Sequence, residues 1–331
     1  MRMSEDEDVL GDRTPRAVND MNNKKLISNI LLLSAAFIWG VSFVFQRKGM
    51  EYIEPLTFAA ARLVLAALTV SLLAVVMEAR DRKRPGYQPK TGEEAKAYKK
   101  NTVLGGVLAG LCLVGAGAFQ QMGVVYTTAG KAGFITTLYM MLVPIINFAV
   151  FRKKSPLQTW VGVVLGVIGL YLLCMTDKSF SLTKGDTLVM ICSIFFALHI
   201  LTCDHFVDLG DPVKISAIQF ITACLCTWVL AFLFEEPTWA KIVSAMVPIA
   251  YCGVMSGGVA YTFQILAQKN TDPTIAALLL SLESVFAVIA GAVMLREMMS
   301  TRELLGCLVM FVAIILVQIP LPTKETKKET L

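Results

Sequence analysis

Residues 273–295 read PTIAALLLSLESVFAVIAGAVML, an apolar stretch whose one charged residue, Glu283, stands in the middle. A transmembrane helix needs about 20 apolar residues to cross a hydrocarbon core about 30 Å thick. At a rise of 1.5 Å per residue, Glu283 lies about 15 Å from either end, too deep for its side chain to reach the membrane surface. The stretch therefore predicts a membrane-spanning helix with a carboxyl group near the midplane.

Similar stretches recur along the whole chain of 331 residues. Apolar residues make up 56% of the sequence and charged residues 17%, against about 45–50% and about 25% in globular proteins. So much apolar surface requires lipid as the solvent, and the stretches are too long and uniformly apolar for barrel strands. We predict an all-α integral membrane protein with ten transmembrane helices at 26–46, 55–77, 102–122, 131–151, 156–176, 186–205, 213–234, 243–267, 274–295 and 302–320.

The distribution of Lys and Arg predicts the orientation of these helices. Basic residues accumulate in cytoplasmic loops, and they are dense in the loop 78–101 and at 152–154. Ten crossings then place both termini in the cytoplasm, with a disordered tail over 1–25 and a short tail over 321–331. The net charge of +5 therefore indicates orientation and not nucleic-acid binding, and we expect a multi-pass protein of the plasma membrane.

The two halves of the chain resemble each other. Residues 115–175 align without gaps with residues 259–319, and the alignment pairs Phe119-Gln120 with Phe263-Gln264, Arg152 with Arg296 and Gly162 with Gly306. This predicts two five-helix repeats, at 26–176 and 186–320. Because each has an odd number of helices, the second crosses the membrane in the opposite sense, an arrangement that suits alternating access.

Short motifs occur in the order of a known family. They are Ile38-Trp39-Gly40-Val41-Ser42-Phe43, Phe58-Ala59-Ala60-Ala61-Arg62, Thr127-Thr128-Ala129-Gly130-Lys131-Ala132-Gly133 and Leu282-Glu283. With them the chain resembles, from Leu26 to Gln318, the EamA-type branch of the drug/metabolite transporter (DMT) superfamily. The resemblance implies a five-plus-five inverted arrangement around a cavity lined mainly by helices one, three, four, six, eight and nine. Ser284 stands where many relatives have proline, which removes the basis for a proline kink there.

Seven residues are candidates for substrate binding: Glu283, Tyr139, Arg62, Trp39, Phe43, Gln120 and Gln264. Glu283 either binds a cationic group of a substrate, or an exchanged proton, or is a structural carboxylate bonded within the bundle. Tyr139 aligns with Glu283 in the repeat and either lines a pocket or packs with its hydroxyl satisfied.

The other candidates also have two interpretations each. Arg62 either holds a substrate carboxylate with two hydrogen bonds or anchors its helix at the interface. Trp39 and Phe43 share a helix face and contribute either to a pocket or to packing. Gln120 and Gln264 need partners, which other helices or a substrate can supply.

Sites of other kinds find little support. His199 and His205 are six residues apart and thus on different helix faces, and Asp204 stands at a helix end, so a metal site is not expected. The eight cysteines lie in apolar stretches without a CxxC pair and indicate buried small side chains. We predict no cofactor.

These features predict a secondary transporter of small metabolites, an exporter of amino acids or related compounds. The sequence contains no Walker motif and no GxSxG motif, and we do not expect an enzyme. The alternatives are an intramembrane enzyme acting on lipid or peptide and a non-transporting signalling or assembly component. The expected partners are a small-molecule substrate and the lipid bilayer, and protons are a further candidate. We expect the chain to be a monomer or a homodimer.

Overall fold

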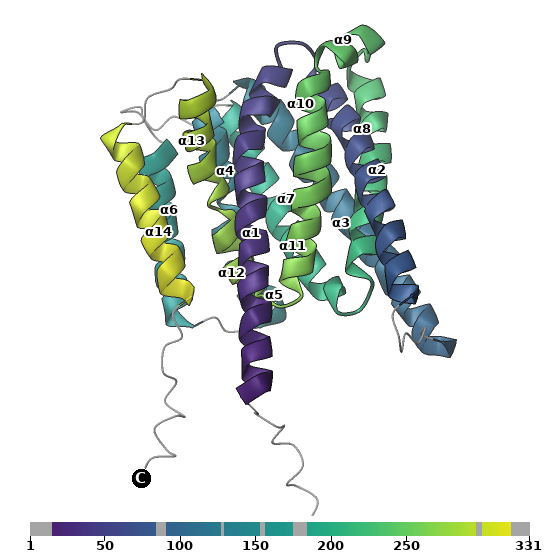
Figure 1. Ribbon diagram of the computed structural model, residues 1–331. Coiled ribbons are helices and arrows are strands. Elements are labelled where there is room, and N and C mark those ends of the chain that lie inside the picture. Colours follow the sequence, from purple (N-terminus) through teal and green to yellow (C-terminus); the bar gives the residue numbers. More distant parts are fainter. Residues whose placement is uncertain are drawn as a thin grey trace, which may run out of the picture.

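A computed structural model describes residues 15–83, 91–126, 129–152, 156–174, 184–295 and 300–318. Throughout these residues the regular structure is helical (Figure 1). The elements are α1 (Pro15–Gly49), α2 (Pro55–Arg82), α3 (Gly92–Tyr126), α4 (Ala129–Thr136), α5 (Tyr139–Phe151), α6 (Leu157–Cys174), α7 (Lys184–Val207), α8 (Pro212–Phe234), α9 (Trp239–Ser244), α10 (Met246–Ala250), the π-helix η1 (Tyr251–Ala260), α11 (Tyr261–Gln268), α12 (Pro273–Leu280), α13 (Glu283–Leu295) and α14 (Thr301–Gln318).

The outer surface of the bundle is apolar. Leu68 and Leu72 on α2 are 64% and 67% exposed, and Leu225 and Phe232 on α8 are 65% and 67% exposed. Seven helical segments of the described chain are long and apolar enough to cross a membrane, and three shorter apolar helices accompany them. Exposed leucine and phenylalanine at this density require lipid contact. The protein is therefore an all-α, multi-pass integral membrane protein, as predicted.

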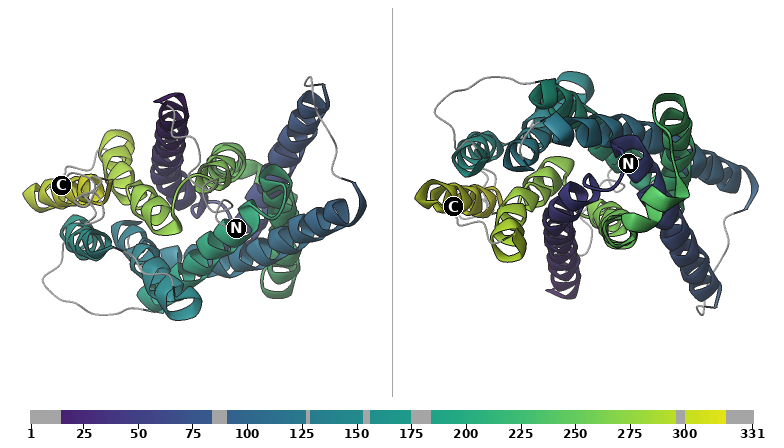
Figure 2. Two further views of the ribbon diagram at one scale, coloured as in Figure 1. Left: turned by 90° about the horizontal axis from the view of Figure 1, so that it is seen from below. Right: turned by 90° about the horizontal axis from the view of Figure 1, so that it is seen from above.

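The helices run roughly side by side, and α9 lies across one end of the bundle (Figure 1). Helix α14 packs against α6, and α8 packs against both α2 and α3. Seen along the helices, the α6 and α14 pair lies at one edge of the molecule (Figure 2). Between these groups α1 contacts α13, η1 and α11, so its length borders the centre of the bundle.

Two predicted helices each contain a short irregular turn, although the second of them, as Pro273–Met294, still forms one apolar segment long enough to cross a membrane. The stretch 131–151 divides into α4 and α5, and the stretch 274–295 divides into α12 and α13. The second halves begin at Tyr139 and Glu283, which are 144 residues apart. Both breaks thus fall at positions that the alignment of the two halves pairs, and the break before Glu283 needs no proline at position 284.

Local hydroxyl groups satisfy the backbone at these breaks. The chain turns through short bonds such as Met140 N to Thr137 O at 3.0 Å. The Thr137 hydroxyl donates to the carbonyl of Gly133 at 3.0 Å, and the Ser281 hydroxyl donates to the carbonyl of Leu278 at 2.7 Å. Such side-chain bonds let a helix break inside a bundle where water does not reach every carbonyl.

The predicted tails and loops are partly wrong. Helix α1 begins at Pro15 rather than at 26, so the disordered tail predicted over 1–25 is incorrect for residues 15–25. Residues 1–14 and the predicted tail 321–331 lie outside the described residues. The basic loop predicted over 78–101 is shorter, because polar residues extend α2 and α3 to Arg82 and Gly92.

Charged side chains join α2 and α8 at both of their ends. At one end Glu235 accepts hydrogen bonds from Leu56 N at 2.8 Å and from Thr57 N and Oγ1 at 2.7 Å each. At the other end Glu78 pairs with Lys214 at 3.0 Å. Glu235 follows Glu78 in the sequence by the same number of residues as Lys214 follows Thr57. The two contacts therefore involve corresponding positions of α2 and α8.

A further ion pair lies beside the first of these contacts. Lys241 of α9 binds Glu54, which precedes α2. The hydrogen bond from Lys241 holds the pKa of Glu54 below its usual value of 4.5. The short helix α9 is thereby attached to the turn between α1 and α2.

Candidate substrate cavity

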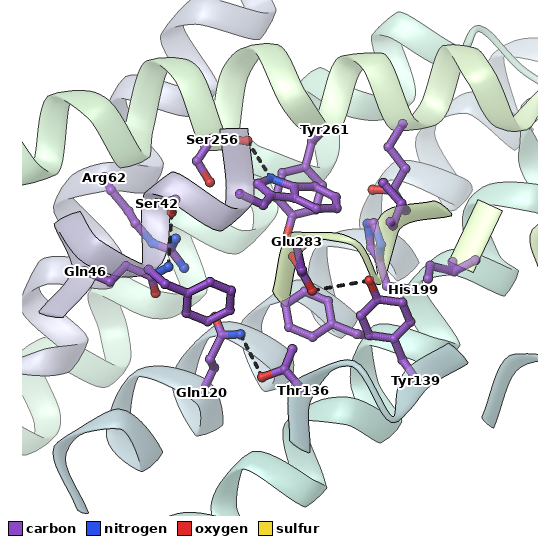
Figure 3. Close-up of a pocket in the computed structure, with 16 residues that line it drawn as sticks. Ser42, Gln46, Arg62, Gln120, Thr136, Tyr139, His199, Ser256, Tyr261 and Glu283 are labelled. Atoms are coloured by element: carbon purple, nitrogen blue, oxygen red, sulfur yellow. Dashed lines mark hydrogen bonds between the residues drawn. The ribbon is translucent and has the colours of Figure 1, made fainter. Parts of the chain in front are cut away.

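A cavity lies at the level of the two helix breaks, and residues of α1, α2, α3, α7, η1 and α11 line it together with the residues at the breaks (Figure 3). The structure brings all seven predicted candidates to this cavity: Glu283, Tyr139, Arg62, Trp39, Phe43, Gln120 and Gln264. They come from six separate stretches of the chain, so the fold rather than local sequence assembles them.

Glu283 and Tyr139 face each other across the cavity (Figure 3). The Tyr139 hydroxyl donates to Glu283 Oε1 at 3.3 Å, and the two side chains are 3% and 5% exposed, respectively. Glu283 also occupies the first turn of α13, where the partial positive charge of a helix start favours a carboxylate. One long hydrogen bond does not satisfy a carboxylate, which has about four lone-pair sites. Glu283 therefore retains capacity to bind a further donor.

Gly40 allows α1 to approach this break closely. A Cβ atom at position 40 would lie 2.7 Å from the carbonyl oxygen of Glu283. Real Cβ atoms do not come so near, so any larger residue would push α1 away from α13. The Gly40 position thus sets the distance between Glu283 and the neighbouring residues Trp39 and Phe43.

Aromatic rings form one wall of the cavity. The rings of Trp39 and Tyr261 lie 4.7 Å apart, and those of Tyr139 and Phe196 lie 6.2 Å apart. Trp39 Nε1 donates to the carbonyl of Ser256 at 3.2 Å. Ser256 belongs to the π-helix η1, a rare conformation that often marks functional sites. The rings make this wall apolar, and hydrogen bonds such as that of Trp39 Nε1 hold the rings in place.

Arg62 points into the cavity from α2 (Figure 3). Its backbone lies against η1, because a Cβ atom at Gly253 would lie only 2.6 Å from the Arg62 carbonyl oxygen. The Nε atom of the guanidinium is buried without a hydrogen-bond partner. The cavity therefore presents an unsatisfied cationic donor as well as the acidic Glu283.

The two predicted glutamines differ in their surroundings. Gln120 Nε2 donates to the hydroxyl of Thr136 at 3.2 Å, so a bond across the cavity orients this amide. Gln264 Oε1 is buried without a partner. Gln46, on α1, uses its amide nitrogen on the Ser42 hydroxyl at 3.1 Å and also leaves its Oε1 unpaired.

Nine further residues line the cavity that were not among the candidates predicted from the sequence: Ser42, Gln46, Thr136, Phe196, His199, Ile200, Ser256, Tyr261 and Leu280. Helical spacing could have found the first two, because Ser42 and Gln46 stand three and seven residues after Trp39, on the same face. His199 was considered only as a metal ligand. In the described residues no cluster of three His, Cys, Asp or Glu side chains could hold a metal ion.

Comparisons with known proteins agree with this architecture. The sequence pattern of the EamA-like transporter family matches the chain twice, over residues 26–175 and 183–319. An uncharacterized transporter of Archaeoglobus fulgidus is 25% identical over 296 residues, which cover 89% of this chain and 87% of the relative. The uncharacterized inner membrane transporter YedA of Escherichia coli is 23% identical over 290 residues, covering 86% of this chain and 89% of YedA.

A solved crystal structure shares the fold, with a TM-score of 0.70 and 13% sequence identity over 88% of this chain and 96% of its own. The two family matches together span most of the chain, and the relatives align over nearly their whole lengths. The protein is a membrane transporter of the EamA-like family, which fits the drug/metabolite transporter superfamily.

Proposed function

We propose that the protein is a secondary transporter that exports amino acids or related small metabolites by alternating access around the cavity. The proposed architecture has ten crossing helices, in two inverted repeats of five over 26–176 and 186–320, with both termini in the cytoplasm and the chain in the plasma membrane. Seven long spans, three shorter apolar helices and two family matches support it.

The observation that carries this proposal is the pair of opposite charges on one cavity. Glu283 offers a carboxylate and Arg62 a guanidinium, and both retain unsatisfied bonding capacity. An ammonium group pairs with the first and a carboxylate with the second, and charge-assisted bonds of this kind are stronger than neutral ones. Amino acids carry both groups, and the side chains that would bind them line one cavity.

The broken helices support alternating access. Helices interrupted at a central site are a recurring feature of secondary transporters, whose two repeats rock against each other around that site. Here the breaks precede Tyr139 and Glu283, one in each half of the chain, so a movement of one half against the other would change the distance between these side chains. We further propose that a proton on Glu283 exchanges with the ammonium group of the cargo.

Transport by the purified protein in sealed liposomes tests the function. Liposomes that contain the protein are loaded with each common L-amino acid in turn. The rate of release is compared with that of loaded liposomes without protein and with that of liposomes that contain the Glu283→Gln variant. We expect release of a subset of amino acids by the wild-type protein alone. Release of every amino acid at the rate of protein-free liposomes would contradict the proposal. Cleavage of lipid or peptide by the same preparation would favour the intramembrane enzyme.

A further inference from the structure

His199 is a buried residue of the cavity to which the proposed transport cycle gives no role. It lies on α7, is 1% exposed and contributes to the cavity lining. Its ring nitrogens have different surroundings: Nε2 lies 3.0 Å from Gln219 Oε1 of α8, whereas Nδ1 is buried without a hydrogen-bond partner. Buried polar atoms are almost always bonded, so an unpaired nitrogen at a cavity points to a ligand.

Gln219 determines which ring nitrogen carries the proton. Its amide oxygen lies 3.0 Å from His199 Nε2 and 4.0 Å from Cys203 Sγ, which also lies 3.5 Å from Nε2, while its amide nitrogen donates to the Ser216 hydroxyl at 3.5 Å. With the Gln219 amide placed so that its oxygen faces the ring, that oxygen can only accept, and we assign His199 Nε2 as the donor. In a neutral imidazole the other nitrogen is then an acceptor. His199 thus presents the lone pair of Nδ1.

The orientation of this lone pair is fixed by packing. The ring of His199 meets the ring of Tyr261 edge to face, with centroids 5.7 Å apart and an interplanar angle of 85°. Tyr261 in turn packs against Trp39. Figure 3 places His199 on the same side of the cavity as Tyr139 and Glu283. The acceptor is therefore rigid and close to the position proposed for the cargo.

Other acceptors of the cavity are unpaired as well. Gln46 Oε1 and Gln264 Oε1 are buried without partners. With Glu283 assigned to the ammonium group and Arg62 to the carboxylate, these neutral acceptors and His199 Nδ1 remain for another part of the cargo. That part must carry hydrogen-bond donors, because acceptors left unpaired by a bound ligand reduce its affinity.

We propose that His199 Nδ1 accepts a hydrogen bond from the side chain of the cargo, so that the transporter selects amino acids with donor-bearing side chains over apolar ones of the same shape. This inference rests on the proposed function. Threonine and valine are a matched pair of probes, since a hydroxyl in one replaces a methyl group in the other. One neutral hydrogen bond corresponds to about 3- to 10-fold in kcat/KM.

Transport kinetics in liposomes give the first test. We expect the wild-type protein to prefer threonine over valine about 3- to 10-fold, and His199→Phe to bring the ratio of the two kcat/KM values near one, whatever the absolute rates. Gln219→Met frees the imidazole to move its proton and should give an intermediate ratio. His205→Gln is the matched control, because His205 is exposed and outside the cavity lining, and it should keep the wild-type ratio.

A nitrogen spectrum of the wild-type protein gives a test that needs no change at position 199. The chain contains two histidines, so ¹⁵N-histidine labelling yields two rings, and His205→Gln assigns them. We expect His199 to be protonated at Nε2 alone and its Nδ1 resonance to shift with threonine but not with valine. A protonated Nδ1, or an unchanged threonine to valine ratio in a transporting His199→Phe, would overturn this inference alone. A wild-type protein that neither transports nor binds any amino acid would overturn the proposed function and this inference with it.

Discussion

Glu235 and Glu283 are glutamates in contrasting surroundings. Glu235, at the end of α8, accepts three hydrogen bonds of 2.7 to 2.8 Å from the start of α2. Glu283, at the centre of the bundle, is more deeply buried and accepts one of 3.3 Å from Tyr139. A carboxylate whose bonds are complete holds two helices together, whereas an incompletely bonded one is costly to bury. We infer that the first serves the fold and the second is kept for cargo.

The largest expected effect is that of Glu283→Gln on transport. Glutamine keeps the size of the side chain and removes the charge that the cargo ammonium requires. Loss of a hydrogen bond to a charged group costs about 1.5–3 kcal/mol, or about 10- to 150-fold in kcat/KM. Because a buried charge is removed, the melting temperature should not fall.

Liposome transport and thermal unfolding in detergent measure these two quantities. Equal transport by Glu283→Gln and the wild type would show that Glu283 is structural, like Glu235. A large fall in melting temperature together with lost transport would show the same.

Arg62→Met should act on the carboxylate end of the cargo. We expect kcat/KM for amino acids to fall about tenfold or more, because a guanidinium bond to a carboxylate is lost. Competition by the corresponding decarboxylated amines should change little, since they lack the group that Arg62 binds. If amines and amino acids lose affinity equally, or if only the expression level changes, Arg62 is an anchor of α2 and not a substrate residue.

Glu235→Gln should show the opposite pattern to Glu283→Gln. Loss of the charged cap at the start of α2 is expected to lower the free energy of unfolding by about 0.5–2 kcal/mol. Transport by the folded fraction should be unchanged. Glu236→Gln is the matched control, because Glu236 is the exposed neighbour of Glu235, and its melting temperature should equal that of the wild type. A transport defect in Glu235→Gln at wild-type stability would contradict the division of roles.

The smallest effect is expected at the ion pair of Glu54 and Lys241. The pKa of Glu54 is lowered in the folded protein by the hydrogen bond from Lys241, so its contribution to stability is complete above 4.5 and is lost as the pH falls through the lower folded value. Both side chains are more than a third exposed, so solvent reduces the contribution to less than about 1 kcal/mol. The Lys241→Met variant should have a slightly lower melting temperature than the wild type near neutral pH and the same melting temperature in acid. A difference that persists in acid would contradict this origin.

Much of the fold could be predicted from the sequence. Stretches such as 273–295 carry a strong physical signal, because only long apolar helices satisfy their backbone within lipid. The breaks at Thr137 and Ser281 could not be predicted, because no proline or glycine stands there and serine and threonine occur within many intact helices. Their hydroxyls become informative only when the carbonyls that they bind are known.

The candidate residues divide in the same way. Glu283, Tyr139 and Arg62 could be selected because polar groups deep in apolar stretches are unusual. His199 could not be recognised as a cavity residue, because its proposed role depends on which of its ring nitrogens is hydrogen-bonded to Gln219. Ser256 and Tyr261 were missed since the π-helical winding of η1, which alters the direction of side chains, leaves no simple sequence pattern.

Access to Glu283 from the two aqueous phases is the most direct measurement of the central claim. In a background without the eight native cysteines, Glu283→Cys is exposed in sealed vesicles to a membrane-impermeant thiol reagent from one side at a time. We expect the cysteine to be labelled from each side. A cysteine at position 283 that the reagent labels from neither side, with or without amino acids, would contradict the proposed access to Glu283.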